Sequence, residues 1–226
     1  MNNLNKLTGQ IHAVANVHTD MHFIYTGEAH GDGYVNYRTL TNKDNRELLR
    51  DVSLAILSKI VAEADLDERE IIVTGPETLG ALMVDTFSER TDLPCAIATI
   101  KLLKDGGGFK WETDPEWWID AERQVVWIDD LLNAGSTLRK SKKMVEALGS
   151  EITAVGVIGD RSGLSAEDLG VGHIVSLEQF NLTRYDLTKE SCPMCDARKP
   201  IVLRPGHGWE FEHKTPNYPG GFVDIK

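Results

Sequence analysis

One stretch of the chain decides its predicted fold: Val125-Val126-Trp127-Ile128-Asp129-Asp130-Leu131-Leu132-Asn133-Ala134-Gly135-Ser136-Thr137-Leu138. Its first four residues are apolar, which is typical of a strand that is buried on both faces. Two adjacent carboxylates follow this strand, and a short loop then leads to Gly-Ser-Thr at the start of a helical pattern. The stretch therefore predicts a strand, a polar loop and a helix in that order.

This junction carries groups that suit a ribose 5-phosphate. Exposed amides at the start of a helix bind anions, and the hydroxyls of Ser136 and Thr137 add donors for a phosphate. The carboxylates of Asp129 and Asp130 can accept hydrogen bonds from the two hydroxyls of a vicinal diol. The alternative is a simple turn at a strand end, in which Gly135 only allows the helix to begin.

Buried strands and helices alternate on both sides of the junction. The predicted strands are 71–74, 95–100, 125–128 and 152–158. Helical periodicity covers 48–60, 79–87 and 137–148. This alternation predicts an α/β fold in which a parallel sheet has helices on both faces. Ligands bind beyond the carboxyl ends of the strands in such folds, so the loops after the four strands should converge on one site.

The length and composition suit one domain with an added segment. The chain has 226 residues, of which 41% are hydrophobic. Residues 1–42 look irregular, with short aromatic runs, and beyond Ser165 the pattern breaks into short pieces rich in turn residues. We therefore expect a single domain over 1–226, with a core at about 43–164 and a small hood formed by 1–42 and 165–226.

Charge and cysteine content exclude several classes of protein. The net charge is −11 and there is no dense basic run, which argues against a nucleic-acid partner. No apolar stretch is long enough to span a bilayer, so we expect no membrane association. Three cysteines make a disulfide framework improbable for a chain of this length, and a reducing cytoplasm is the expected compartment.

Residues 125–138 resemble the phosphoribosyl pyrophosphate motif of type I phosphoribosyltransferases. That motif has an apolar strand, two acidic residues, two variable positions, Thr-Thr-Gly and a hydroxyl residue. This chain has Asn133 and Ala134 where the family usually has two threonines. The resemblance implies that Asp129 and Asp130 hold the ribose diol. It implies a 5-phosphate loop of Asn133, Ala134, Gly135, Ser136 and Thr137.

A second segment is similar to the family's pyrophosphate loop, whose amides face the leaving group. The residues that match it are Thr74, Gly75, Pro76 and Glu77. An ordinary turn between strand and helix is the alternative. The resemblance also implies that Lys101 and Lys104, together with Mg²⁺, stabilise the departing pyrophosphate. The glycines of 105–111 would suit a closing lid, or else a flexible surface loop.

The chain most resembles orotate phosphoribosyltransferase-like proteins that have a late Cys-Pro-x-Cys segment. Residues 23–37 are similar to the hood segment of that branch, and 159–163 to its Asp-Arg turn under the base. Tyr25 and Arg161 are therefore expected to face the base. Strict orotate enzymes have a lysine at the position of Tyr25, and a loop Arg and His that this chain lacks. The acceptor is expected to be orotate or a related pyrimidine.

Two further classes of function are considered. A protein of this fold can bind phosphoribosyl pyrophosphate or a nucleotide and regulate without turnover, which Asn133, Ala134 and the reduced basic loop would suit. A serine hydrolase finds no support, because the chain has no Gly-x-Ser-x-Gly elbow. The family resemblance implies a homodimer, for which Trp117-Trp118 and the apolar hood are the candidate contacts.

Cys192 and Cys195, with His207 and His213 downstream, approximate the spacing of a Cys2His2 zinc site. The alternative is a tight turn with two partly buried thiols. We favour the turn, because a single Cys-x2-Cys pair is not specific and His207 lies in the turn sequence Pro205–Gly208. A structural zinc is therefore expected to be absent or substoichiometric.

Overall fold

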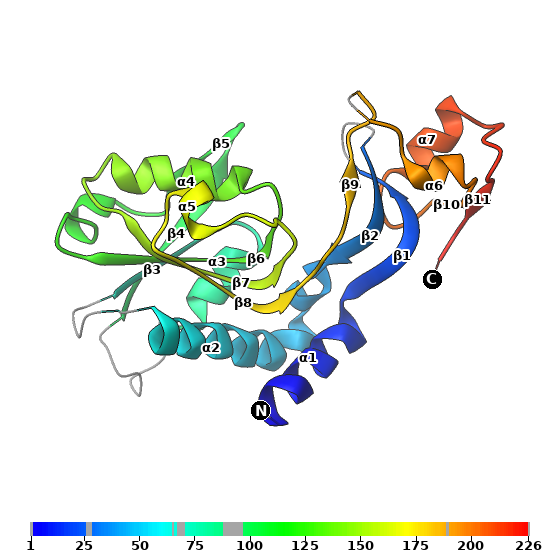
Figure 1. Ribbon diagram of the computed structural model, residues 1–226. Coiled ribbons are helices and arrows are strands. Elements are labelled where there is room, and N and C mark those ends of the chain that lie inside the picture. Colours follow the sequence, from blue (N-terminus) through cyan, green and yellow to red (C-terminus); the bar gives the residue numbers. More distant parts are fainter. Residues whose placement is uncertain are drawn as a thin grey trace. The chain divides into compact units, whose positions relative to one another are not determined.

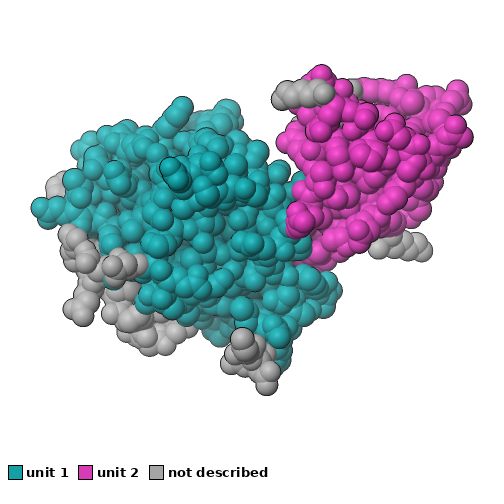
Figure 2. Space-filling view, in the orientation of Figure 1, with its two compact units in different colours: residues 1–14, 37–180 teal, residues 15–36, 181–226 magenta. Residues whose placement is uncertain are grey.

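The protein was analysed as a computed structural model that describes residues 2–25, 29–64, 66, 71–87, 97–188 and 190–225. The chain forms two compact units, which Figure 2 shows in different colours. Unit 1 contains residues 1–14 and 37–180, and unit 2 contains 15–36 and 181–226. These limits differ from the expected core and hood, because the first helix and all residues up to Phe180 belong to unit 1.

Unit 1 is built on a six-stranded sheet with the strand order β5-β4-β3-β6-β7-β8 (Figure 1). Its strands are β3 (Ile71–Pro76), β4 (Ile97–Asp105), β5 (Gly108–Trp111), β6 (Gln124–Leu132), β7 (Ile152–Asp160) and β8 (His173–Gln179). All neighbours pair in parallel except β5, which is antiparallel to β4. The predicted parallel sheet is confirmed. The predicted strand 95–100 begins at two residues that lie outside the described part of the chain.

Helices cover both faces of this sheet, as predicted. Unit 1 contains α1 (Asn2–Val14), α2 (Arg46–Glu63), α3 (Leu79–Asp85), α4 (Ser136–Glu146) and α5 (Ala166–Leu169). Short 3-10 helices among its described residues lie at Arg38–Thr41, Lys43–Asn45 and Pro115–Trp117. In Figure 1, α4 and α5 lie on one side of the sheet and α2 on the other. A Cβ on Gly156 of β7 would approach Ile56 of α2 within 2.4 Å, so only glycine allows this packing distance.

Unit 2 contains a second sheet, with the strand order β11-β10-β1-β2-β9. Its elements are β1 (Asn16–Ile24), β2 (His30–Asn36), β9 (Arg184–Tyr185), α6 (Pro193–Asp196), β10 (Ile201–Val202), α7 (Gly208–Lys214) and β11 (Phe222–Val223). The sheet combines the antiparallel β1–β2 hairpin with three two-residue strands from the end of the chain. The hairpin and the late segments are thus joined by main-chain hydrogen bonds within one unit.

The expectation that residues 1–42 are irregular was wrong. Residues 2–14 form α1, and its apolar positions Leu4, Leu7, Ile11 and Val14 recur at helical spacing, a signal that the aromatic runs obscured. Residues 16–36 form the β1–β2 hairpin. The first six residues of β1 are exposed or half-buried and the last three are buried, so the strand lacks a clear alternation of apolar residues. Among the described residues, no helix has the length and apolar character that crossing a membrane requires.

Candidate active site at the carboxyl end of the unit 1 sheet

Asp129 and Asp130 lie near the carboxyl end of β6, which continues two residues beyond them. Asp129 is 9% exposed, and its Oδ1 accepts a hydrogen bond of 2.9 Å from the amide of Asp130. Burial raises the pKa of the Asp129 carboxyl well above its usual range, and the neighbouring Asp130 charge adds to this, while Lys104 acts in the opposite direction. Burial also raises the pKa of Asp130. A nearby cation or hydroxyl donors would therefore stabilise the charged form of both carboxylates.

The loop after β6 turns sharply into α4. Gly135 has a φ of 69°, and a Cβ there would lie 2.6 Å from the side chain of Leu169, so the turn requires glycine. Asn133, Ala134 and Ser136 are exposed, and Thr137 is half-buried. Arg139 of α4 donates from Nη1 to the Ala134 carbonyl over 2.6 Å, a contact that sequence reasoning missed. The arrangement leaves the start of α4 accessible to an anion.

The loop after β3 packs directly against this junction. A Cβ on Gly75 would lie 2.6 Å from the Ile128 carbonyl, and one on Gly80 would lie 3.2 Å from Oδ1 of Asp129. The Glu77 amide donates to the Leu102 carbonyl at 2.8 Å, and Glu77 Oε2 accepts from the Lys104 amide at 3.0 Å. Thr74 is fully buried, and its hydroxyl has no hydrogen-bond partner among the described residues. Thr74 can therefore contribute only through its backbone.

The two lysines of β4 have different surroundings. Lys101 Nζ lies 2.9 Å from a carboxylate oxygen of Asp85 and 2.9 Å from one of Glu112, and these contacts raise its pKa. Lys104 is exposed and lies close enough to Asp129 to lower the pKa of that carboxyl. Of the two, Lys104 is the cation whose charge lowers the pKa of Asp129.

The glycine-rich segment expected to form a lid or a flexible loop is the tip of a β-hairpin. β4 extends to Asp105 and pairs with β5, which begins at Gly108. Lys140 of α4 donates from Nζ to the Gly107 carbonyl at 2.8 Å and so ties the tip to the helix after the candidate phosphate loop. Sequence reasoning missed this hairpin because Gly106 to Gly108 lack the features of a strand.

Arg161 follows β7 at the same edge of the sheet. Its amide donates to the Leu132 carbonyl at 2.9 Å, which places it beside the end of β6. The preceding Asp160 is 8% exposed and accepts hydrogen bonds from the amide and hydroxyl of Ser162. Tyr25 belongs to unit 2, where its phenol donates to the Gly33 carbonyl. Within unit 1, the structure thus brings the carboxylates, the glycine turn, the β3 loop and Arg161 to one edge.

Comparisons with known proteins agree with this architecture. No protein-family model matches the chain. The chain is 25% identical over 187 residues to the orotate phosphoribosyltransferase of Caldanaerobacter subterraneus subsp. tengcongensis, which covers 82% of this chain and 88% of that protein. It is 28% identical over 121 residues to the adenine phosphoribosyltransferase of Symbiobacterium thermophilum, covering 48% of this chain and 71% of that protein.

Two solved structures show the same fold. The orotate phosphoribosyltransferase of Mycobacterium tuberculosis in complex with inorganic phosphate gives a TM-score of 0.54 at 16% identity, covering 79% of this chain and 96% of that one. The adenine phosphoribosyltransferase of Thermoanaerobacter pseudethanolicus gives a TM-score of 0.53 at 19% identity. The match covers 76% of this chain and 99% of that one. This chain has the type I phosphoribosyltransferase fold. These relatives and solved structures are named orotate or adenine phosphoribosyltransferases.

One network of this phosphoribosyltransferase fold was not anticipated from the sequence. Tyr37 donates from its hydroxyl to Oε2 of Glu178 at 3.0 Å, and Nε2 of His12 lies 2.6 Å from the other oxygen of that carboxylate. Tyr37 also packs on Gly159 near the end of β7, and burial raises the pKa of its phenol. The three residues come from distant parts of the chain, so only the tertiary structure shows them as neighbours.

The zinc candidates divide into two sets. Cys192 and Cys195 lie together with His22 and His30 in unit 2. His207 instead lies 3.3 Å from a carboxylate oxygen of Glu210, and His213 lies 2.9 Å from the Trp209 carbonyl, so neither belongs to the described cluster.

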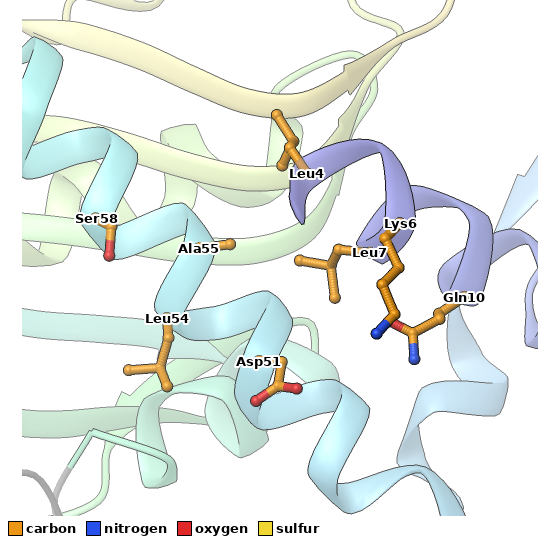
Figure 3. Close-up of a pocket in the computed structure, with 8 residues that line it drawn as sticks. All are labelled: Leu4, Lys6, Leu7, Gln10, Asp51, Leu54, Ala55 and Ser58. Carbon is orange, nitrogen blue, oxygen red and sulfur yellow. The ribbon is translucent and has the colours of Figure 1, made fainter. Parts of the chain in front are cut away.

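Two grooves elsewhere on the phosphoribosyltransferase fold share no residue with the carboxyl-edge site. One, of about 690 Å³, lies between α1 and α2 (Figure 3). It is lined by Leu4, Lys6, Leu7, Gln10, Asp51, Leu54, Ala55 and Ser58. The other, of about 480 Å³, is lined by residues of α2 and α3 and by Thr86. Neither lining contains a pair of adjacent carboxylates or a glycine turn at a helix start.

Proposed function

We propose that this protein transfers the ribose 5-phosphate of phosphoribosyl pyrophosphate to a nucleobase, with orotate or a related pyrimidine as the acceptor. The observation that carries the proposal is the pair of carboxylates, buried Asp129 and half-buried Asp130, beside the glycine turn that opens α4. A ribose 5-phosphate carries a vicinal diol and a phosphate in one small molecule, and these groups match the two features. The names of the relatives agree with the same chemistry.

The reaction breaks the bond between the anomeric carbon and the pyrophosphate oxygen and forms a bond from that carbon to a ring nitrogen of the base. The transition state resembles an oxocarbenium ion, and the base itself is the nucleophile. The protein must therefore orient the ribose, bind the leaving group and exclude water. Asp129 and Asp130 would hold the ribose hydroxyls, the amides at the start of α4 the 5-phosphate, and the amides after Gly75 the pyrophosphate.

Mg²⁺ fits this site, because carboxylate and phosphate oxygens are the ligands it prefers. When bound, the ion would offset the negative charge of the departing pyrophosphate. Asp129 and Asp130 are the protein ligands or water-mediated partners that the described residues offer. Lys104 is the additional cation, because it already acts on the Asp129 carboxyl.

Our proposal that the acceptor is a pyrimidine rests on Arg161. This residue stands beside the end of β6, at the same edge as the two aspartates that would hold the ribose, so we place the base next to it. A guanidinium can bind a carboxylate through two hydrogen bonds, which suits an anionic base. Several relatives are named orotate phosphoribosyltransferase, whereas one is an adenine phosphoribosyltransferase, so the acceptor is the part of the proposal that most needs an assay.

A regulator that binds phosphoribosyl pyrophosphate without turnover is the second candidate. One observation favours it. Lys101, expected to meet the pyrophosphate, is held between Asp85 and Glu112.

Pyrophosphate release decides between the two. The protein would be assayed with phosphoribosyl pyrophosphate, Mg²⁺ and one base at a time from orotate, uracil, hypoxanthine, adenine and nicotinate, with the Asp129→Asn, Asp130→Asn double variant as the control. We expect turnover with orotate or another pyrimidine and none in the double variant. Calorimetric binding of phosphoribosyl pyrophosphate without release with any base would establish the regulator instead.

A further inference from the structure

Four atoms of the kind that bind metals meet inside unit 2. They are Nε2 of His22, Nδ1 of His30 and the Sγ atoms of Cys192 and Cys195, and all lie within 4.8 Å of one another. We propose that they bind one Zn²⁺ ion in tetrahedral coordination, as a structural metal of unit 2, in place of the absent or substoichiometric zinc expected from the sequence. This site is separate from the proposed transferase chemistry and does not depend on it.

Two of the distances between these atoms match the edges of a zinc tetrahedron, and two are shorter by about half an ångström or less. Bonds of about 2.3 Å to sulfur and about 2.0–2.1 Å to nitrogen place neighbouring ligand atoms roughly 3.3–3.8 Å apart. Nε2 of His22 lies 3.7 Å from Sγ of Cys192 and 3.8 Å from Sγ of Cys195. Nδ1 of His30 lies 3.2 Å from Sγ of Cys195 and 2.8 Å from Nε2 of His22. Opening the two short edges by about half an ångström gives the geometry of the bound ion.

The surroundings of the cluster fit a resident metal. His22, His30 and Cys192 are buried, at 1%, 0% and 2% exposure, and Cys195 is half-buried. Nδ1 of His22 lies 3.1 Å from the Lys199 carbonyl, a hydrogen bond that puts the proton on Nδ1 and leaves the Nε2 lone pair for the ion. The edge of Phe211 packs against the ring of His30 and that of Tyr218 against His22, which fixes both rings and excludes solvent.

The ligand set identifies the ion and its role. Two thiolates and two imidazoles form the Cys2His2 set that selects zinc over harder cations. Four protein ligands leave no open position for water or substrate, so the site is structural rather than catalytic.

The four ligands come from two segments of unit 2 that are far apart in the sequence, so a bound metal would join these segments. His22 and His30 lie on the two strands of the β1–β2 hairpin, whereas Cys192 and Cys195 lie at the start of α6. His30 and Cys195 are separated by 165 positions in the sequence, which include almost all of unit 1. Unit 2 is small and its late strands have two residues each. Bringing the β1–β2 hairpin and α6 together closes a long loop, which costs entropy. The free energy of metal binding would offset this cost.

The first test is the metal content of the full chain. The protein would be produced in zinc-supplemented medium, dialysed with a thiol reductant, and measured by elemental mass spectrometry. We expect about one zinc per chain in the wild type, and less than about a fifth of that in Cys195→Ser and in His30→Ala. His207→Ala and His213→Ala are the matched controls, and both should retain the full zinc content. Wild-type protein without zinc, or loss of zinc only in these two controls, would overturn the assignment.

A second measurement does not depend on variants that fold. Cobalt would be added to the metal-free wild-type chain under reducing conditions. We expect one equivalent to produce the visible absorption of tetrahedral cobalt with a thiolate-to-cobalt charge-transfer band, and zinc to displace it. Saturation without the charge-transfer band, or a spectrum of octahedral cobalt, would show that the thiols do not bind the ion and would refute the proposal.

Discussion

Asp129 shows how a single residue links stability to binding. Its carboxylate is buried beside a second carboxylate, and both effects raise its pKa above the usual value of 3.8. Because the folded pKa lies above the unfolded one, the folded state binds more protons. The free energy of unfolding therefore falls as the pH rises through the interval between the two values. The charged pair costs stability in the free protein, which fits a group that is retained to bind a ligand.

We therefore expect Asp129→Asn to raise the free energy of unfolding at neutral pH while it weakens ligand binding. Asn keeps the oxygen that accepts from the Asp130 amide but carries no charge. The gain should vanish below about pH 3, where the wild-type side chain is protonated in both states. Denaturant unfolding at several pH values measures it. Asp51→Asn, at an exposed position of α2, is the control and should change little. A loss of stability at neutral pH that persists at acid pH would contradict the linkage.

The double variant Asp129→Asn, Asp130→Asn should lose phosphoribosyl pyrophosphate binding with little loss of fold stability. Hydrogen bonds to charged groups contribute about 1.5–3 kcal/mol each, so the loss of two carboxylates lowers affinity on the order of 100-fold or more. Calorimetric titration in the presence of Mg²⁺ measures the affinity. Wild-type affinity in the double variant would remove these residues from the proposed site.

Arg161→Ala should suppress the turnover of an anionic pyrimidine far more than it affects phosphoribosyl pyrophosphate binding. The loss of one charged contact of about 2–3 kcal/mol lowers kcat/KM for orotate roughly 30- to 150-fold. Steady-state kinetics with orotate, uracil, hypoxanthine and nicotinate measure it, with Arg50→Ala of α2 as an exposed control. Turnover of a neutral purine that is untouched by the change would exclude the pyrimidine acceptor and leave the transferase proposal standing.

Among the elements, α4 connects the fold most directly to the proposed chemistry. Its start faces the loop of Asn133 and Ala134, and its side chains tie that loop and the β4–β5 tip in place through Arg139 and Lys140. Gly135 precedes the helix and Gly149 follows it, and both have positive φ values, of 69° and 81°. The two glycines differ in their surroundings, because a Cβ on Gly149 would meet nothing within 4 Å.

This difference gives a matched pair of variants. Gly149→Ala should destabilise the fold by about 1–2 kcal/mol, the cost of an L-residue in the left-handed region. Gly135→Ala should cost more, because its Cβ would also meet the Leu169 side chain at 2.6 Å. Only Gly135→Ala should also weaken phosphate binding, because its Cβ would displace Leu169 or Arg139 and shift the amides at the start of α4. Thermal unfolding and titration with phosphoribosyl pyrophosphate measure the two effects. Equal ligand affinity in the two variants would argue against an anion site at this turn.

At the scale of the whole molecule, we expect a homodimer. The family resemblance implies one, and Trp118, which is 42% exposed, is one of the two tryptophans named as a candidate contact. Light scattering at micromolar concentration should give about twice the chain mass of 25.1 kDa. A mass equal to that of one chain under these conditions would contradict the prediction.

The sequence was most informative where the decisive pattern is local. The strand–acid–acid–glycine–helix order of residues 125–138 lies in consecutive positions, and hydrophobic patterning with turn chemistry is enough to predict β6, the turn and α4. The same patterning predicted β3, β7 and the parallel sheet. It was uninformative for β5 and for the hairpin β1–β2, whose strands are glycine-rich or exposed and are defined by pairing with a neighbour.

The sequence by itself therefore determined the sheet, the helix that follows β6 and the residues at the candidate phosphate turn, because each rests on neighbours a few positions away. Only the tertiary structure decided which histidines accompany Cys192 and Cys195, and that Lys101 is held between two carboxylates. Nothing in the local sequence separates His22 and His30 from the nearer His207 and His213. The choice is made by strand pairing across more than a hundred positions, and contacts at that separation are specified by packing of the whole unit rather than by spacing.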